Sequence, residues 1–439
     1  MTTYQSWGRY PSTEQTIFPV QWASDNIPVL ARKPVLAYGK GRSYGDVCLN
    51  DKGILLDTRY LNHFIQFDRT TGILRCESGV SLQEILQFIV PMGWFLPVTP
   101  GTQFVTLGGA IANDVHGKNH HIAGTFGCHV RQFELLRSDG QRLLCSKTNN
   151  SDWFGATIGG LGLTGLITWA EIQLIPMNNP FIQMESIKFH SIEEFLALSK
   201  ASEKDYIYTV AWLDCLQEKR SRGLFMQGNH APPLFDQEPA PKKLSKWLSV
   251  PLDMPNFVLN HASVKAFNFL YFNKQVPEVT RGVSHYLPFF YPLDSVQRWN
   301  RIYGKRGFFQ YQCVVSENDP HVIKSILAEI AKSGEGSFLS VIKIFGKIPS
   351  AGLLSFPRAG ITLALDFANK GDATHKLFAR LDAIVREDGG RLYPAKDARM
   401  AGSDFKHFYP EWERFQTFID PHFSSSFWRR VTQRPAKNG

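Results

Sequence analysis

Three glycine-rich segments stand out as residues whose type and spacing could bind a ligand. They are Gly39 to Gly45, the run from Pro100 to Ala110, and Gly159 to Gly165. Glycine has no side chain to block the approach of backbone N–H groups, and several such groups together can bind a phosphate. The first segment has the spacing GxGxxxG, which differs from the GxGxxG dinucleotide fingerprint and from an ATP-binding loop. Taken alone, it is more typical of a structural turn, because glycine-rich turns are common.

Side chains that could contact an anion follow the second segment. They form the run Asn113-Asp114-Val115-His116-Gly117-Lys118-Asn119-His120-His121. Ordinary hydrogen bonding within a loop is the alternative for His120 and His121. A metal site formed with His116 is disfavoured, because Lys118 would repel a cation. Since each glycine-rich segment adjoins a predicted strand, one extended cofactor explains the three segments better than three coincidences.

Short strands and one helix are predicted around these segments. Apolar runs predict strands at 54–57, 63–68, 73–78 and 166–174 and a hairpin of 133–137 with 142–145. The capping box Ser81–Glu84 predicts a helix that continues to Ile89. A second region begins near Pro176. It contains a capping box at 191–194, strands at 207–213, 338–345 and 361–367, and helices at 321–332 and 374–387.

One stretch of the second region, residues 229–260, is rich in proline and lysine. Its prolines disfavour regular structure, so the sequence predicts a mobile basic loop. Lys242, Lys243 and Lys246 could approach anionic lipid headgroups, while Trp247, Leu248 and Val250 could enter the membrane interface. A surface loop without a partner is the alternative.

The composition places the chain among ordinary globular proteins. It has 439 residues, of which 43% are hydrophobic and 20% charged, and no apolar run is long enough to span a bilayer. No signal peptide is expected at the N-terminus, and the six widely spaced cysteines fit reduced thiols in the cytoplasm. A net charge of +9 leaves nucleic acid, anionic lipid and a phosphorylated substrate open as partners.

Short motifs along nearly the whole chain carry a resemblance to a known family. They are GRSYGD, PGT, GGAIA, HGKNHH, AG, FG, HVR, GLTG, FPxxG and LYxAKDxR. The chain resembles the vanillyl-alcohol oxidase and p-cresol methylhydroxylase superfamily of FAD-linked oxidases. Within it, the chain is most similar to the flavin oxidases that serve as components of decaprenylphosphoryl-ribose 2′-epimerases.

The resemblance implies that FAD lies across the first region. The implied cofactor-binding residues are Gly39, Lys40, Gly41, Arg42, Ser43, Tyr44, Gly45, Gly101, Thr106, Leu107, Gly108, Gly109, Asn113, Asp114, Val115, His116, Ile167 and Tyr393. Some superfamily members attach the flavin covalently through a histidine in the first loop. Arg42 stands at that position here and cannot form the bond, so noncovalent FAD is expected.

The resemblance also implies the residues at the substrate. The implied substrate-binding residues are Tyr44, Gly117, Lys118, Trp212, Gln312, Lys343, Phe345 and Lys396, with Lys396, His116 and Lys118 as catalytic residues. Lysines suit a phosphate or a developing alkoxide, and aromatic rings suit a sugar or a lipid. Core packing is the alternative for Trp212 and Phe345, and a surface salt bridge for Lys396.

Four positions depart from the family pattern. Where the mycobacterial type carries serine, tyrosine, asparagine and cysteine, this chain has Val210, Phe290, Thr362 and Ala364. Several polar contacts to the substrate are therefore lost, which leaves the identity of the sugar and the lipid open.

The expected fold is α+β in two domains. An FAD-binding domain at 1–180, a substrate-binding domain at 181–389 and a C-terminal return to the FAD domain at 390–439 are predicted. The resemblance implies oxidation of a secondary alcohol on a polyprenyl-phosphorylated sugar to a ketone, with an NAD(P)H-dependent reductase as the partner enzyme. A cytoplasmic protein with peripheral contact at the inner membrane is expected, with neither nucleic acid nor metal bound.

Two other functions remain open at this point. An FAD-dependent oxidase of a free sugar, alditol or aldonolactone would use the same cofactor site. A basic, non-catalytic protein that binds nucleic acid or membrane is the third hypothesis, although the basic residues are spread along the chain rather than clustered.

Overall fold

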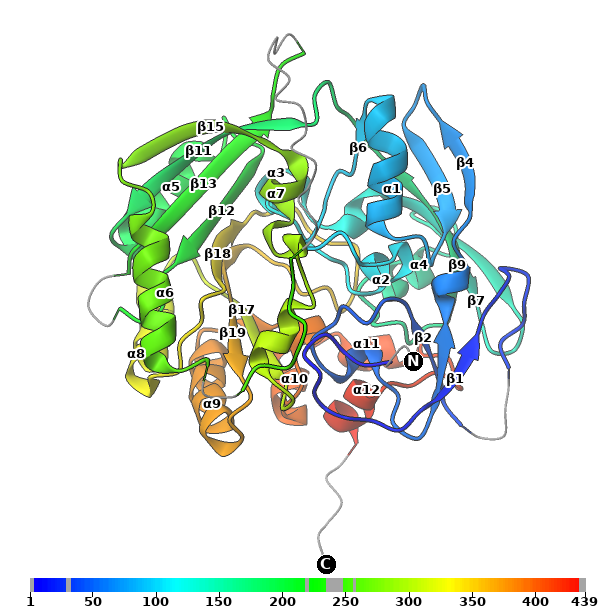
Figure 1. Ribbon diagram of the computed structural model, residues 1–439. Helices are drawn as coiled ribbons and strands as arrows, with labels where there is room; N and C mark the ends of the chain where they lie inside the picture. The colour runs from blue at the N-terminus through cyan, green and yellow to red at the C-terminus, as the bar shows by residue number, and fades with distance from the viewer. Residues whose placement is uncertain (1–3, 29–32, 218–220, 234–247, 256–257, 434–439) are drawn as a thin grey trace, which may run out of the picture.

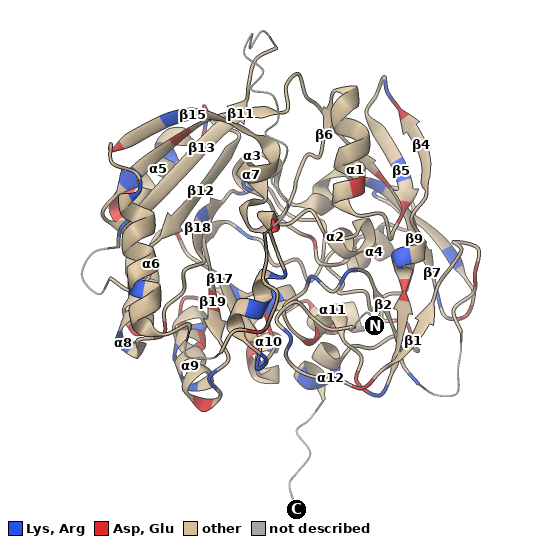
Figure 2. Cartoon of the chain, in the orientation of Figure 1, with Lys and Arg blue, Asp and Glu red and all other residues tan. Residues whose placement is uncertain are grey.

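The fold is α+β, as predicted, and its helices pack around two large antiparallel sheets (Figure 1). A computed structural model describes residues 4–28, 33–217, 221–233, 248–255 and 258–433. The five-stranded sheet lies on one side of the molecule and the eight-stranded sheet on the other. Lys and Arg are interspersed with Asp and Glu over both halves (Figure 2).

The five-stranded sheet forms the core of the first region. Its order is β4 (Phe64–Asp68), β5 (Ile73–Glu77), β9 (Leu166–Gln173), β7 (Val130–Leu136) and β8 (Arg142–Ser146). Helix α1 (Leu82–Ile89) begins at the predicted capping box, in which the Glu84 N–H donates to Ser81 and the Ser81 N–H donates to Glu84. Leu82, Ile85, Leu86 and Ile89 are buried in the core shared with this sheet, which confirms the predicted amphipathic helix.

A small parallel sheet carries the first glycine-rich segment. Its order is β1 (Thr16–Pro19), β3 (Ile54–Asp57) and β2 (Val35–Tyr38). The segment begins at Gly39, directly after β2. The second segment enters the short helix α2 (Leu107–Ala112), and the Thr106 hydroxyl accepts a hydrogen bond from the Gly109 N–H. Helices α3 (His120–Ala123) and α4 (Ser151–Thr157) complete this part.

The eight-stranded sheet forms the second region. Its order is β15 (Val279–His285), β11 (Phe181–Phe189), β13 (Gly223–His230), β12 (Tyr208–Leu213), β18 (Ser340–Phe345), β19 (Gly360–Ala368), β17 (Phe308–Val315) and β20 (Arg391–Leu392). Helices α5 (Ile192–Ser202), α8 (Pro320–Ser333) and α9 (Asp372–Glu387) share a buried core with this sheet. Alternate strand residues such as Leu363 and Leu365 lie in that core, so their neighbours point to the other face.

The C-terminal segment connects the two regions. After β20 it continues through α10 (Gly402–Phe408), α11 (Trp412–Gln416) and α12 (Ser426–Thr432). Arg430 of α12 forms ion pairs with Asp46, beside the first glycine-rich segment, and with Asp397. These paired charges tie the segment to the first region. The exact domain boundaries stay a prediction.

The proline- and lysine-rich stretch differs in part from its prediction. Residues 234–247 and 256–257, which include Lys242, Lys243, Lys246 and Trp247, lie outside the described residues. Strand β13 extends to His230, and β14 (Leu248–Ser249) pairs with β16 (Val296–Gln297). Val250 is buried and donates its N–H to the Gln297 carbonyl, so its predicted insertion into a membrane is wrong.

Two local details of the second region also differ from expectation. Ser191 accepts a hydrogen bond from the Glu194 N–H, but the Glu194 carboxylate binds the His190 N–H and so leaves the capping box incomplete. Helix α6 (His261–Asn273) was not predicted, since its apolar residues lack clear helical spacing. The small helix α7 (Tyr286–Phe290) follows β15.

Candidate active site

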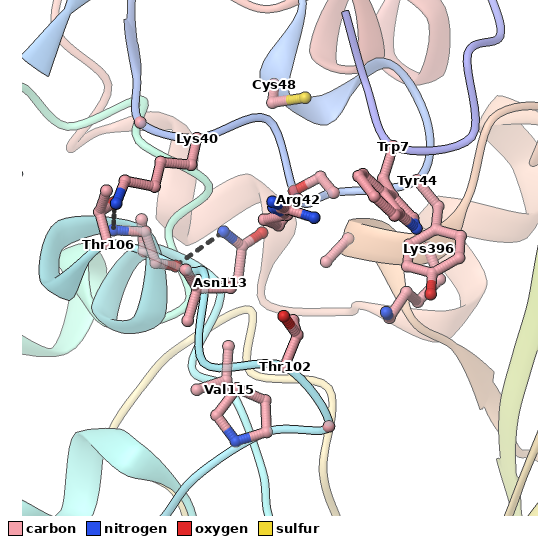
Figure 3. A pocket seen from close by; sticks show the side chains of 18 of the residues that line it. Trp7, Lys40, Arg42, Tyr44, Cys48, Thr102, Thr106, Asn113, Val115 and Lys396 are labelled. Carbon is pink, nitrogen blue, oxygen red and sulfur yellow. Dashed lines mark hydrogen bonds between the residues drawn. The ribbon is translucent and has the colours of Figure 1, made fainter. Parts of the chain in front are cut away.

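A cavity of about 350 Å³ lies where the two regions meet. Its walls come from all three glycine-rich segments, from the strands β12, β17, β18 and β19, and from the C-terminal segment. Figure 3 shows Arg42 between Lys40 and Asn113 on one side and Trp7, Tyr44 and Lys396 on the other. Residues far apart in the sequence therefore line one continuous space.

Most of the predicted residues line this cavity. Those on the wall are Gly39, Lys40, Gly41, Arg42, Ser43, Tyr44, Gly101, Thr106, Gly108, Gly109, Asn113, Val115, His116, Gly117, Lys118, Ile167, Gln312, Lys343, Tyr393 and Lys396. Leu161, Gly162 and Gly165 of the third glycine-rich segment join them. The four positions that differ from the family pattern also lie on the wall; they are Val210, Phe290, Thr362 and Ala364. The geometry brings the predicted set together, while the role of each residue stays a prediction.

The glycine-lined part of the cavity fits an elongated polar cofactor such as FAD. Arg42 Nε, Ser78 Oγ and Asn113 Oδ1 are buried on this wall and have no hydrogen-bond partner among the described residues. Buried polar atoms are normally paired, so these three atoms are suited to a ligand. Gly41 has a φ of 59°, and a Cβ there would lie 2.2 Å from the Tyr38 hydroxyl. Only glycine fits this position without strain.

Arg42 is held by aromatic side chains. Its guanidinium carbon lies 4.2 Å from the ring centroid of Trp7 and 5.0 Å from that of Phe104. Burial lowers the pKa of Arg42, and nearby Asp294 opposes the shift. Arginine stacked in this way keeps its charge and presents N–H donors to an anion.

The opposite part of the cavity is built by side chains around His116. Lys343 Nζ donates to His116 Nδ1 at 3.0 Å and to the Gly117 carbonyl at 2.8 Å. The Gln312 side-chain amide lies 3.0 Å from His116 Nε2. Burial, followed by the charge of Lys343, lowers the pKa of His116 well below its usual value. His116 is therefore neutral at pH 7 and holds these two side chains at the cavity.

Three lysines converge on this part of the cavity. Burial lowers the pKa of Lys118 to about 8 and the pKa of Lys343 to about 7, the latter helped by the charges of Lys118 and Lys396. Burial also lowers the pKa of Lys396 to about 7. Lys396 Nζ lies 3.8 Å from the ring centroid of Tyr44, as Figure 3 illustrates. Amines with such values can exchange protons near neutral pH.

The charge of the cavity wall favours an anionic ligand. The described lining residues include the cations Lys40, Arg42, Lys118, Lys343 and Lys396 but a single carboxylate, Asp294. Burial raises the pKa of Asp294 to about 6. A phosphate would offset this excess of positive charge.

Five predicted residues lie outside the cavity wall. They are Gly45, Leu107, Asp114, Trp212 and Phe345. Gly45 packs against the Asp397 backbone, Leu107 is a core residue, and Asp114 accepts hydrogen bonds from Gly127, Ser350 and Ser355. These three residues support the wall from behind.

The two aromatic residues of this group are covered by neighbouring side chains. Trp212 is packed with Tyr271 and Phe272 of α6 and donates its indole N–H to the Phe338 carbonyl. The Phe345 ring lies 4.8 Å from that of His116. The packing anticipated as an alternative for both residues is thus observed, and Phe345 supports the His116 ring.

Sequence reasoning missed several polar residues of this site, among them Gln310 and Asp366 as well as Ser78 and Asp294. Gln310 lines the cavity, and its amide donates to Asp366 Oδ1 at 2.5 Å. Gln310 precedes Gln312 by two residues, and Asp366 follows Ala364 by two. Because alternate strand residues share a face, that spacing was the available signal.

Comparisons with known proteins bear on the function. The FAD binding domain model matches residues 12–146. Decaprenylphosphoryl-beta-D-ribose oxidase of Mycolicibacterium smegmatis is 36% identical over 445 residues, which cover 97% of this chain and 96% of the relative. The chain belongs to the vanillyl-alcohol oxidase superfamily of flavoproteins. It is an FAD-dependent oxidoreductase, which excludes the non-catalytic hypothesis.

More distant relatives share parts of the chain. L-gulonolactone oxidase of Mus musculus is 27% identical over 39% of this chain and 40% of its own. Delta(24)-sterol reductase of Rattus norvegicus is 32% identical over 26% of this chain and 22% of its own.

Across the described ranges, no helix has the length and apolar character required to cross a bilayer. In the same part of the chain, no three His, Cys, Asp or Glu residues are grouped as a metal site.

Proposed function

We propose that this chain oxidises a secondary alcohol of a polyprenyl-phosphorylated sugar to a ketone, the first half of a 2′-epimerisation such as that of decaprenylphosphoryl-ribose to -arabinose. The convergence of Lys118, Lys343 and Lys396 on one part of the cavity carries this proposal. The full-length similarity to a decaprenylphosphoryl-beta-D-ribose oxidase supports the same substrate class.

Each group around the cavity has a proposed task. Lys118 and Lys343 bind the phosphate, and Gln312 binds a sugar hydroxyl. Lys396 takes the proton of the reacting hydroxyl, because burial holds its pKa near 7. When bound, FAD supplies the acceptor for the hydride that leaves the carbinol carbon. The apolar side chains of Val210, Phe290 and Val341 line the same cavity and exclude water.

The cofactor is proposed to bind noncovalently. Arg42 stands where a histidine would form the covalent link, and its guanidinium is held between Trp7 and Phe104. Precipitation of the protein with acid is expected to leave all flavin in the supernatant. Yellow colour that stays with the denatured chain would refute this part of the proposal.

The substrate class is tested by anaerobic mixing of the FAD-loaded protein with candidate sugars while the flavin absorbance is followed. Bleaching by polyprenyl-phosphoryl pentoses but not by free pentoses is expected. Bleaching by free sugars alone would contradict the proposal.

The ketone product also requires a second enzyme, so we propose an NAD(P)H-dependent reductase as the partner that returns the carbon to an alcohol.

An oxidase of a free sugar, alditol or aldonolactone is the second candidate. The partial similarity to an L-gulonolactone oxidase favours it. Such an enzyme would reduce oxygen rapidly without any lipid, whereas an epimerase component should prefer a quinone or dye as the electron acceptor. Oxygen consumption with both kinds of sugar separates the two candidates.

A further inference from the structure

A buried carboxyl group behind the cavity has no assigned role. Asp366 of β19 is 1% exposed. Its Oδ1 accepts the hydrogen bond from Gln310, but no hydrogen-bond partner of its Oδ2 is found among the described residues. An unpaired carboxylate oxygen in the interior is costly and calls for a nearby compensating charge.

Strand register places this carboxyl beside the reacting end of the cavity. Asp366 pairs with Gln310 across β19 and β17, and Ala364 pairs with Gln312 two residues further along. Both Gln310 and Gln312 line the cavity, so the Asp366 side chain lies on the same face of the sheet. Gln310 stands between Asp366 and the open space.

Lys396 is a cation near Asp366, because it lines the same cavity as Gln310, whose side chain donates to the Asp366 carboxylate. The charges of Lys396 and Asp366 interact, and no direct ion pair between them is found among the described residues. Burial raises the pKa of Asp366 to about 7 and lowers the pKa of Lys396. The charge of Lys396 opposes the rise at Asp366, and the charge of Asp366 opposes the fall at Lys396. Each group therefore favours the ionised form of the other.

We propose that Asp366 is a positioning residue that stabilises the ammonium form of Lys396, and so controls how readily Lys396 takes the hydroxyl proton of the substrate. This inference rests on the proposed function for the identity of Lys396 as the base. In that step the O–H bond of the alcohol breaks and an N–H bond forms at Lys396 Nζ. The two electrons of the C–H bond leave as hydride to the oxidised cofactor, and the C=O bond forms.

The other charged and titratable groups around the pair do not replace Asp366. His116 faces Lys396 from the HGK segment and Lys343 faces it from β18, while Lys118 acts on Lys343, and positive charge on any of them disfavours a further cation. Tyr44 lies under Lys396, and Tyr303 faces Asp366. Burial raises the pKa of both tyrosines well above the usual value, so both are neutral. Among the described residues, Asp366 is therefore the anion that acts on Lys396.

The test is a titration of Lys396 in the FAD-loaded protein without substrate. The rate of Lys396 acetylation by dilute acetic anhydride is measured against pH by mass spectrometry. Asp366→Asn keeps the shape of the side chain but removes its charge. We expect the midpoint of labelling to fall by about one pH unit or more, because the ammonium form loses its stabilising charge.

The matched control is Asp294→Asn. Asp294 is also buried at this cavity, but it faces Arg42 and accepts a hydrogen bond from the Gln103 N–H. This control should leave the Lys396 midpoint unchanged. An equal shift in both variants, or an unchanged or higher midpoint in Asp366→Asn, would overturn the proposal. These outcomes do not depend on which sugar the enzyme oxidises, so they are separate from a failure of the proposed function.

A second variant covers the case in which Asp366→Asn does not fold. Gln310→Leu keeps the carboxyl but removes the hydrogen bond that stabilises its ionised form. Asp366 then holds its proton to higher pH, and the Lys396 midpoint should fall by less than in Asp366→Asn. An unchanged midpoint in Gln310→Leu would contradict the proposal.

Discussion

The two parts of the cavity differ in how the chain builds them. The glycine-lined part depends on backbone packing, since a Cβ at Gly39, Gly41 or Gly108 would lie 3.0 Å or less from an atom of a neighbouring side chain. The lysine-lined part is formed by side chains on β12, β17, β18 and β19, on the HGK segment and on the C-terminal segment. Backbone defines the shape that fits the cofactor, and side chains define the charges that fit the substrate.

This difference implies that the two parts can be damaged separately. A substitution in the lysine-lined part should impair chemistry while the flavin stays bound. A substitution in the glycine-lined part should weaken flavin binding first.

The largest effect is expected for Lys396→Ala. The variant should retain FAD but reduce it with substrate at least about 100-fold more slowly, because the proton acceptor is lost. Stopped-flow absorbance gives the rate, and flavin content per chain gives the binding. Lys376→Ala, at an exposed lysine of α9, is the matched control. An unimpaired rate in Lys396→Ala would show that the lysine has no part in the chemistry.

The pH dependence of the wild-type rate of flavin reduction should report the protonation state of Lys396. The Lys396 amine must be neutral to accept a proton, and its pKa is lowered to about 7. The rate of anaerobic flavin reduction should therefore reach a plateau above about pH 8 and fall about tenfold per pH unit well below 7. A rate that is flat from pH 5.5 to 9 would contradict this assignment.

A smaller effect is expected for Gly41→Ala in the glycine-lined part. The φ of 59° strains the alanine, and its Cβ would displace the Tyr38 hydroxyl, so FAD should bind about tenfold more weakly. Fluorescence titration of the released and rebound flavin measures the affinity. Gly140→Ala is the matched control, since its φ is 85° but no atom of the described residues, its two chain neighbours aside, lies within 4 Å of the added Cβ. Equal losses in both variants would mean that backbone strain alone explains the effect.

The smallest expected effect is on the binding of the protein to anionic membranes. A polyprenyl substrate stays in a bilayer, and three lysines in 229–260 provide about 1 kcal/mol each toward anionic lipid. Flotation with anionic vesicles should recover part of the protein at low salt and little at high salt. Replacement of Lys242, Lys243 and Lys246 by alanine, which leaves the paired strand β14 and the buried Val250 in place, should abolish the low-salt fraction. If that fraction persists, another surface makes the contact.

Much of the glycine-lined part could be predicted from sequence because it depends on local signals. The capping box of α1, the strands on either side of the turn at Gly72, and the three glycine-rich segments are all contiguous in the chain. Such features follow from residue type and short spacing. Their convergence on one cavity was inferred from the number of segments and is observed.

The lysine-lined part depends on strand register, which the sequence does not reveal. Gln310 and Asp366 meet only because β17 and β19 pair in one particular alignment. Trp212 was expected at the substrate, but α6 covers it, and that helix lacks a clear amphipathic pattern. Resemblance to a family located the lysines, whereas the carboxyl behind them required the structure.

The most direct test of the proposed oxidation identifies its product. The FAD-loaded protein is incubated with a polyprenyl-phosphoryl pentose and a dye acceptor, and the mixture is reduced with borodeuteride. The account predicts one deuterium at a single ring carbon and two epimers at that carbon, because a secondary alcohol has become a ketone. Recovery of the starting sugar without deuterium, while a free sugar is oxidised under the same conditions, would contradict it.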